Sequence, residues 1–208
     1  MKSFFRNIVL SFVRRIYPII KQVYAENEAH TEELLVRSFA SCGENFQVGA
    51  AYRIEGCKYI RLGDSFSAGN NLRAVVIDHY GNQFFSPQLL IGNNVRIEDN
   101  CHIGCIEHIE IGDGTLIASK VFISDHFHGN VDTRDIGIAP SERILTSKPV
   151  KIGKNVWIGD GVCIMPGVVL GDNVIVGANA VVTHSFPENS VIVGCPAKLL
   201  KTLNEKTN

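Results

Sequence analysis

The stretch IGKNVWIGDGVCIMPGVVLGDNVIVGANAVVT, residues 152–183, decides the fold of this chain. An aliphatic residue recurs at every sixth position of it, namely Ile152, Ile158, Ile164, Leu170, Val176 and Val182. A period of six is not that of a helix, but it gives three short strands per coil of about eighteen residues, with the leading aliphatic residue of each strand pointing inward. Stacked coils then share one continuous core, so the stretch predicts a parallel β-helix.

The same spacing recurs upstream, from about residue 48. The successive runs are Val48, Ile54, Ile60; Leu62, Ala68, Ala74; Ile91, Ile97, Ile103; and Ile111, Ile117, Ile123. Between runs the register slips by a short apolar step, as in HIEIGD (108–113) and PVKIGK (149–154). Gly, Asn and Asp are expected to turn the corners, where a positive φ is needed. The predicted fold is mainly β, with the β-helix over residues 45–194.

Residues 152–183, followed by VIVGCPAKLLK (191–201), resemble the hexapeptide-repeat acyltransferases. The resemblance covers roughly residues 45–201, and its most specific parts are NVWIG (155–159) and G-x-P-A-K (194–198). Within that family the chain is most similar to the sugar O-acetyltransferases of O-antigen and capsule biosynthesis, which are related to galactoside and maltose acetyltransferases. The resemblance implies a left-handed coil, a homotrimer and acetyl-CoA as the acetyl donor.

The repeat stops between Ile123 and Val150, where the chain is too long and too polar to be a strand. An extruded loop is therefore expected over residues 124–149, and long loops on rigid scaffolds are commonly functional. A shorter irregularity over residues 78–90, which carries Tyr80, predicts a smaller loop that helps to shape a pocket.

The sequence ISDHFHG (123–129) places His126 and His128 where the coil passes into this loop. Acetyl transfer to an alcohol needs a general base near neutral pH, and histidine has an ordinary pKa of about 6.5. Asp125 is placed to orient one imidazole. In the galactoside and maltose acetyltransferases the catalytic histidine occupies the sixth hexad position, so the resemblance favours His128. Because those relatives have His-Pro and this chain has His-Gly, His126 stays a second candidate, and the remaining histidine is a candidate for binding the acceptor.

The resemblance also implies a binding site for the donor. Trp157 matches a tryptophan that lines the active site of relatives. The residues implied to hold the pantetheine arm, largely through backbone groups, are Asp160, Ala178 and Thr183. Lys198 and Lys201 match basic residues that meet the nucleotide phosphates, a role that suits the point charge of lysine. No metal is expected, since a zinc site would need a third histidine, for which His102 is the candidate.

The segments outside the repeat are expected to be helical. The apolar spacing in residues 1–28, within an arm of residues 1–44, predicts an amphipathic helix that Pro18 breaks. Its basic residues all precede the first acid, which suits a peripheral membrane contact through residues 1–24; packing against the trimer is the alternative. The sequence CPAKLLKTLNEK (195–206) predicts a short helix in a tail of residues 195–208.

Composition narrows the function further. The 208 residues carry a net charge of −1, so no overall basic field indicates nucleic acid. The six cysteines form no C-x-x-C, and no signal peptide or long apolar run is evident, which predicts a cytoplasmic protein, at most peripheral at the inner face of the membrane. The expected function is acetyl-CoA-dependent O-acetylation of a sugar hydroxyl in a surface polysaccharide. A small soluble acceptor, an amino sugar, or a non-catalytic trimeric scaffold are the alternatives.

Overall fold

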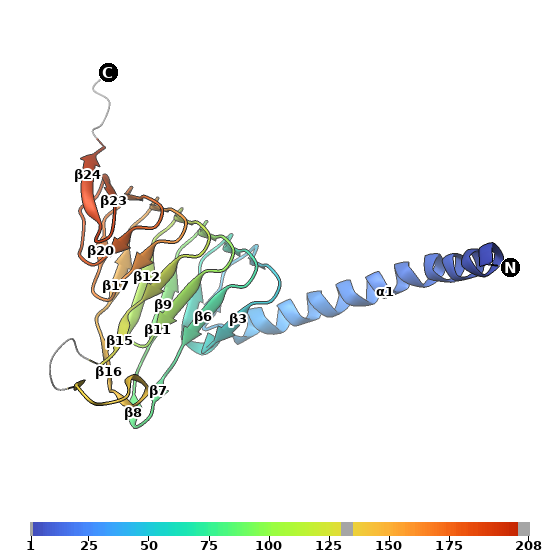
Figure 1. The fold of residues 1–208 in the computed structure, drawn as a ribbon, viewed down its shortest axis with the longest axis horizontal. Coiled ribbons are helices and arrows are strands. Elements are labelled where there is room, and N and C mark those ends of the chain that lie inside the picture. Colours follow the sequence, from blue (N-terminus) through green and yellow to red (C-terminus); the bar gives the residue numbers. More distant parts are fainter. Residues whose placement is uncertain (1, 130–134, 204–208) are drawn as a thin grey trace, which may run out of the picture. The chain divides into compact units, whose positions relative to one another are not determined.

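The computed structural model describes residues 2–129 and 135–203 of the chain (Figure 1). The contacts divide it at Ser38 into a helical arm and a β domain. The arm is a single helix, α1 (Lys2–Ser38), and Pro18 lies inside it. The prediction that Pro18 would break the helix was therefore wrong. The missing hydrogen bond and the clash of the proline ring cost about 3 kcal/mol. The helix propensities of the residues on both sides offset that cost.

The β domain winds through three parallel sheets in turn, which we call A, B and C. Sheet A contains β1 (Ser41–Cys42), β4 (Ile60–Leu62), β9 (Gln88–Ile91), β12 (His108–Ile111), β17 (Val150–Ile152) and β20 (Val169–Leu170). Sheet B contains β2 (Gln47–Val48), β5 (Ser67–Ala68), β10 (Arg96–Ile97), β13 (Leu116–Ile117), β18 (Trp157–Ile158), β21 (Ile175–Val176), β23 (Ser190–Val193) and β24 (Lys198–Thr202). Sheet C contains β3 (Arg53–Glu55), β6 (Arg73–Val76), β11 (His102–Cys105), β14 (Phe122–Ser124), β19 (Cys163–Ile164) and β22 (Val181–Val182).

The predicted six-residue repeat is confirmed residue by residue in the strand registers. In sheet C, Ile103 pairs with Ile123, which in turn pairs with Ile164. Sheet B stacks Ile117 on Ile158 in the same way. All of these side chains are at most 1% exposed, so the columns of aliphatic residues form one continuous core inside the coil.

The chain turns the corners of the coil in two ways: some residues adopt a positive φ, and others form side-chain hydrogen bonds to the next coil. Asparagines adopt positive φ at many corners, for example 54° at Asn155 and 60° at Asn173. None of the aspartates has a positive φ in the described residues, contrary to expectation. Their carboxylates instead accept hydrogen bonds from the next coil, as when the Lys154 N–H donates to Asp172 at 2.7 Å. At these corners a hydrogen bond to the short aspartate side chain thus takes the place of a left-handed backbone conformation.

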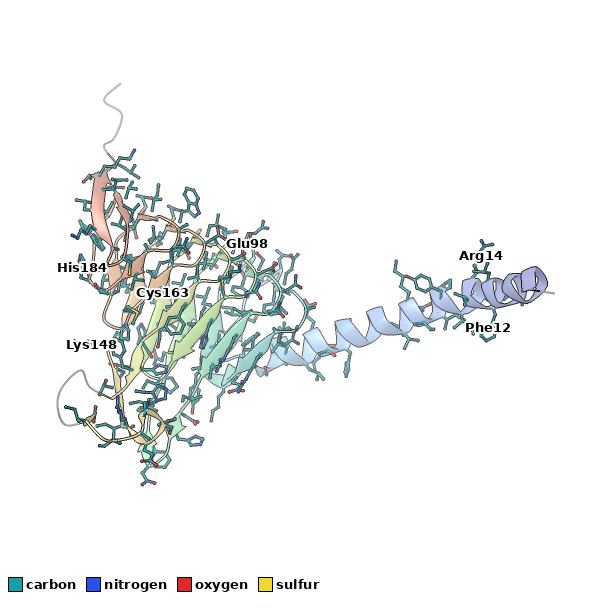
Figure 2. All side chains as sticks on the ribbon, in the orientation of Figure 1. Phe12, Arg14, Glu98, Lys148, Cys163 and His184 are labelled. Atoms are coloured by element: carbon teal, nitrogen blue, oxygen red, sulfur yellow. The ribbon has the colours of Figure 1, made fainter. Side chains whose placement is uncertain are left out.

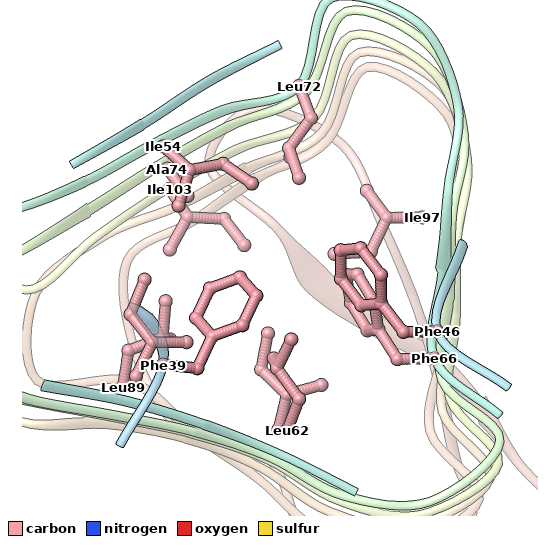
Figure 3. A pocket seen from close by; sticks show the side chains of 12 residues that line it. Phe39, Phe46, Ile54, Leu62, Phe66, Leu72, Ala74, Leu89, Ile97 and Ile103 are labelled. Carbon is pink, nitrogen blue, oxygen red and sulfur yellow. The ribbon is translucent and has the colours of Figure 1, made fainter. Parts of the chain in front are cut away.

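The amino-terminal end of the core is closed by aromatic side chains. Phe39, Phe46 and Phe66 are all buried, and the ring centroids of Phe46 and Phe66 are 5.8 Å apart. Together with aliphatic residues of the first coils they line an internal cavity of only about 20 Å³ (Figure 3). This group of aromatic side chains begins at Phe39, directly after α1. The coil therefore starts slightly before residue 45, the predicted boundary.

The carboxyl-terminal end is closed by a strand. Residues Lys198–Thr202 form β24, which pairs antiparallel with β23. The predicted C-terminal helix was therefore wrong over the described residues, which end at 203. The last strand of sheet B has free backbone groups along its edge, and their pairing with β24 outweighs the weak helical spacing of Leu199, Leu200 and Leu203.

Two excursions leave the coil, and both leave it at the corner between sheets C and A. The first runs from β6 to β9 and forms the hairpin of β7 (His79–Tyr80) and β8 (Gln83–Phe84). The second runs from β14 to β17 and contains the antiparallel pair β15 (His126–His128) and β16 (Leu145–Ser147). We call this second excursion the long arm; its residues 130–134 lie outside the described part. Short 3₁₀ turns occur at Cys57–Tyr59 and, in the long arm, at Pro140–Glu142.

The core columns predict that substitutions at inward positions of a coil lower the free energy of unfolding more than substitutions at outward positions. Ile158 is fully buried, so Ile158→Ala is expected to lower the free energy of unfolding by about 2–5 kcal/mol, through lost burial and a residual cavity. Val169→Ala, at a position 45% exposed, should cost less than about 1 kcal/mol. Denaturant unfolding at one protein concentration measures both, and equal losses would contradict this core assignment.

Candidate active site

At the C–A corner, a pocket of about 310 Å³ lies between the outer face of sheet C and the two excursions. Its floor follows from strand alternation: because Ala74, Ile103 and Ile123 point inward, their neighbours point outward. One outward row of sheet C contains Arg73, His102 and Phe122, and the adjacent row contains Val75, Gly104 and Ser124. The excursions add Tyr80, His126, His128 and Leu145 to the wall.

Asp125 closes the corner from inside the protein. It is 0% exposed, and its carboxylate accepts backbone N–H groups from Ile106 at 3.0 Å, Glu107 at 2.8 Å and His108 at 2.9 Å. Burial raises the pKa of the Asp125 carboxyl, but the hydrogen bonds from His126, Glu107 and Ile106 outweigh burial, so the pKa lies below its ordinary value. A fixed negative charge therefore lies directly behind the pocket.

His126 is held by that charge. Its Nδ1 lies 2.9 Å from Oδ1 of Asp125, and its side chain is 17% exposed. Because an ionised carboxylate only accepts, Nδ1 carries the proton, and the lone pair of the neutral ring falls on Nε2. The ring packs over Gly104, where a Cβ atom would lie 3.2 Å from Cε1 of His126. Gly104 thus provides the room that the imidazole occupies.

His128 lies two residues further along β15 and is exposed. Its ring meets Tyr80 edge-on, with centroids 5.4 Å apart, and its Nδ1 is 3.5 Å from the Tyr80 hydroxyl, the long limit of a hydrogen bond. That hydroxyl donates its one hydrogen to the Ser141 carbonyl at 2.7 Å, so its oxygen can only accept from His128. The arrangement again favours a proton on Nδ1 and a lone pair on Nε2.

The two excursions are fastened to each other. The Gln83 amide donates to the Leu145 carbonyl at 3.0 Å and accepts the Leu145 N–H at 2.6 Å. At the base of the first hairpin, Asp78 accepts hydrogen bonds from Tyr59 at 2.7 Å and from His79 at 2.9 Å. Hydrogen bonds from His79, Tyr59 and Lys58 hold the pKa of Asp78 well below its ordinary value. Pairing of Leu145 with His128 then ties the position of this histidine to the first hairpin.

Several pocket residues were not anticipated from the sequence as parts of the site, among them Arg73, Gly104 and His102. Arg73 and Gly104 occupy outward positions of strands and carry no signal beyond that alternation. His102 was considered only as a metal ligand, and it forms an edge-on contact with Phe122, with centroids 5.2 Å apart. Burial, followed by the positive charge of Arg73, lowers the pKa of His102. The described residues include no cluster of three or more His, Cys, Asp or Glu side chains arranged to hold a metal.

The residues expected to bind the donor lie elsewhere on the coil. Trp157 is on sheet B and 52% exposed, while Asp160 and Ala178 follow β18 and β21 at the B–C corner, where the Asn179 N–H donates to the Asp160 carbonyl at 2.7 Å. Thr183 follows β22, and Lys198 and Lys201 are exposed on β24. None of these six residues lines the histidine pocket.

Thr183 is the donor-site candidate on the same corner as the histidines. Its neighbour His184 and the last residues of the long arm, around Lys148, lie along one edge of the coil (Figure 2). Next to them, the Gly167 N–H donates to the Lys148 carbonyl at 3.1 Å, and the Val169 N–H donates to the Ser185 hydroxyl at 2.9 Å. The chain thus places Thr183 beyond the long arm, toward the carboxyl-terminal end.

Comparison with known proteins identifies the family. Residues 149–184 match the bacterial transferase hexapeptide family (six repeats). The chain is 45% identical over 154 residues to WbbJ of Escherichia coli K12, a proposed lipopolysaccharide biosynthesis O-acetyl transferase, covering 71% of this chain and 74% of WbbJ.

Solved structures of acetyltransferases have the same fold. A maltose O-acetyltransferase from Clostridium difficile 630 is 30% identical with a TM-score of 0.53, over 84% of this chain and 75% of that one. A galactoside acetyltransferase in complex with coenzyme A is also 30% identical, with a TM-score of 0.51 over 84% and 70% of the two chains. The chain therefore belongs to the hexapeptide-repeat acetyltransferases, and its three-sided coil is the left-handed parallel β-helix of that family.

Proposed function

We propose that this acetyltransferase uses acetyl-CoA to acetylate a sugar hydroxyl of a surface polysaccharide, such as an O-antigen, a capsule or an exopolysaccharide. The observation that carries the proposal is the pocket in which His126 and His128 meet, with the buried Asp125 carboxylate behind one of them. The similarity to WbbJ supports the substrate class, and the coenzyme A complex of the galactoside enzyme supports the donor.

His128 is the proposed general base. Its Nε2 has no hydrogen bond within the described residues, its ring is exposed at the pocket, and it occupies the sixth position of its hexad. The base takes the hydroxyl proton of the sugar as the sugar oxygen attacks the thioester carbonyl. The tetrahedral intermediate then expels the CoA thiolate, which receives the proton from the imidazolium. The transfer is direct and needs no acyl-enzyme.

His126 is the proposed partner of the acceptor. Its position is more recessed than that of His128, and Asp125 fixes its ring, so its Nε2 can orient a sugar hydroxyl toward the base. Asp125 is a positioning residue in this scheme, since its oxygens are occupied by His126 and by backbone N–H groups. It also stabilises positive charge in the pocket while the proton is transferred.

The donor is proposed to bind through Trp157, Asp160, Ala178, Thr183, Lys198 and Lys201. Because none of these residues lines the histidine pocket of a single chain, the thioester must reach the pocket from another direction. A homotrimer supplies that geometry if the donor lies in a groove between two subunits, with its phosphates near the exposed lysines of β24. The acceptor then enters from the side of the long arm.

Helix α1 is proposed as a peripheral membrane contact, which would bring the enzyme to a lipid-linked acceptor at the inner face of the membrane. Its apolar side chains Phe12, Ile19 and Val23 share one face of the helix and are 58–64% exposed, and Arg14, Arg15 and Lys21 are exposed too. An apolar face flanked by basic residues suits an anionic lipid surface. Within the described residues, no helix is both long enough and apolar enough to span a membrane.

The histidine assignments predict distinct kinetic losses. His128→Ala should lower kcat by about 10²- to 10⁴-fold while acetyl-CoA binding is retained, because the base is lost. His126→Ala should mainly raise the KM for the acceptor. Release of free CoA in the presence of a panel of sugars and glycan fragments measures both, with His108→Ala as a control outside the pocket.

The outcomes separate the alternatives. Loss of kcat in His126→Ala alone would reverse the two roles, and two variants that match wild type would make both histidines structural. A protein that fails to bind acetyl-CoA at all would be a scaffold, and turnover of free sugars or amino sugars alone would favour a small acceptor.

Asp125→Asn is expected to lower the free energy of unfolding at pH 7 by about 1–3 kcal/mol, because charged hydrogen bonds are lost. The pKa of Asp125 is lowered in the folded state, so the carboxylate stabilises the fold fully above the unfolded value of about 3.9. This stabilisation disappears as the pH falls through the folded pKa. The difference between variant and wild type should therefore narrow below about pH 4, as measured by denaturant unfolding across pH. A constant difference, or one matched by the exposed Glu188→Gln, would contradict the role of this charge.

The membrane proposal predicts that the 208-residue chain co-sediments with phosphatidylglycerol vesicles, less so at high salt, and far less with phosphatidylcholine vesicles. The double variant Arg14→Glu, Arg15→Glu should weaken binding at least about tenfold, since each basic residue contributes roughly 1 kcal/mol. Arg37→Glu, at the other end of the helix, is the matched control. Binding that ignores salt and charge reversal, or no binding, would leave α1 as a packing element of the trimer.

A further inference from the structure

Arg73 is a cation without a partner in the proposed acceptor pocket. It is exposed on β6, lines the pocket, and forms no hydrogen bond or ion pair within the part of the chain that the structure describes. Its neighbour in the register, Arg53, is bonded to Glu55 at 2.6 Å, and Arg96 on sheet B is bonded to Glu98 at 2.7 Å. These two arginines are neutralised by the acid two residues later, whereas that position after Arg73 is Val75.

The surroundings of Arg73 keep its charge unbalanced. Among the described residues no carboxylate lines the pocket, and Asp125 lies behind His126 with its oxygens occupied. His102 is the register partner of Arg73 on the next strand, and the Arg73 charge is one cause of its lowered pKa. The wall opposite the long arm is therefore electropositive, and the charge of Arg73 is available to a ligand.

We propose that Arg73 binds an anionic group of the acceptor, a carboxylate or a phosphate, and thereby selects acidic or phosphorylated sugars. The inference rests on the proposed function, since it specifies the acceptor of the same pocket. A guanidinium presents parallel N–H donors that match the oxygens of either group, and the ring N–H of His102 can add a third donor.

The spacing fits a single sugar residue. Two inter-strand spacings, about 10 Å in total, separate β6 from β14, the strand from which the long arm departs. An acceptor anchored at Arg73 by its charged substituent therefore reaches His126 and His128 with a hydroxyl about one pyranose ring away. Val75 and Phe122 line the pocket between these two ends and offer apolar surface to the sugar ring.

Binding of matched sugars to the 208-residue chain tests the proposal without turnover. Ligand-observed NMR gives the Kd of methyl β-D-glucuronide and of its neutral counterpart methyl β-D-glucoside, and glucose 1-phosphate provides the phosphate arm. The charged probes should bind about 10- to 100-fold more tightly than the neutral one, and the arm with the larger preference identifies carboxylate or phosphate. Arg73→Gln should abolish the preference, whereas Arg53→Gln should keep it.

Two results would overturn the proposal: equal or absent binding of charged and neutral probes to the wild type, or a preference that survives in Arg73→Gln. Neither result bears on acetyl transfer itself, which the CoA-release assay decides separately. Conversely, a preference for the charged probes without any CoA release would leave Arg73 as an anion site and contradict the proposed transferase activity of the pocket.

Discussion

The rest of the structure depends on pairing between equivalent positions of successive coils. Each strand is only a few residues long and would be unstable alone. It pairs with strands of neighbouring coils, and its inward aliphatic residue stacks on the aliphatic residues of those coils. Any insertion within a strand would shift an aliphatic residue out of its column. Extra residues can therefore be accommodated only at corners, and both long excursions of this chain are found there.

The pocket arises from that restriction. Both excursions leave the same corner, so their side chains meet above the outer face of sheet C, although they come from segments far apart in the sequence. Asp125 sits at the branching point, where it satisfies three backbone N–H groups of the previous coil and holds His126. One buried carboxylate thus completes the scaffold and holds a histidine of the pocket, so a change at Asp125 affects both.

The sequence predicted the coil well because its signal is periodic and local, and each hexad carries the same information. It also placed the histidine pair, since ISDHFHG is where that period fails. Pro18 and the C-terminal strand were mispredicted for opposite reasons: a helix outlasted one unfavourable residue, and an unpaired sheet edge overrode the spacing of three leucines. Arg73, Gly104 and Gln83 could not be found as site residues, because their roles come from contacts across the fold that no short sequence pattern records.

The register across the long arm has an evolutionary consequence. Ile111 of β12 pairs directly with Ile152 of β17, so the coil continues as if the whole arm between them were absent. Changes in the length of the arm beyond Asp125 therefore leave the register of the coil intact, while they act directly on the pocket whose wall the arm forms. A lineage of such acetyltransferases can therefore remodel this pocket by exchanging one loop on a constant coil.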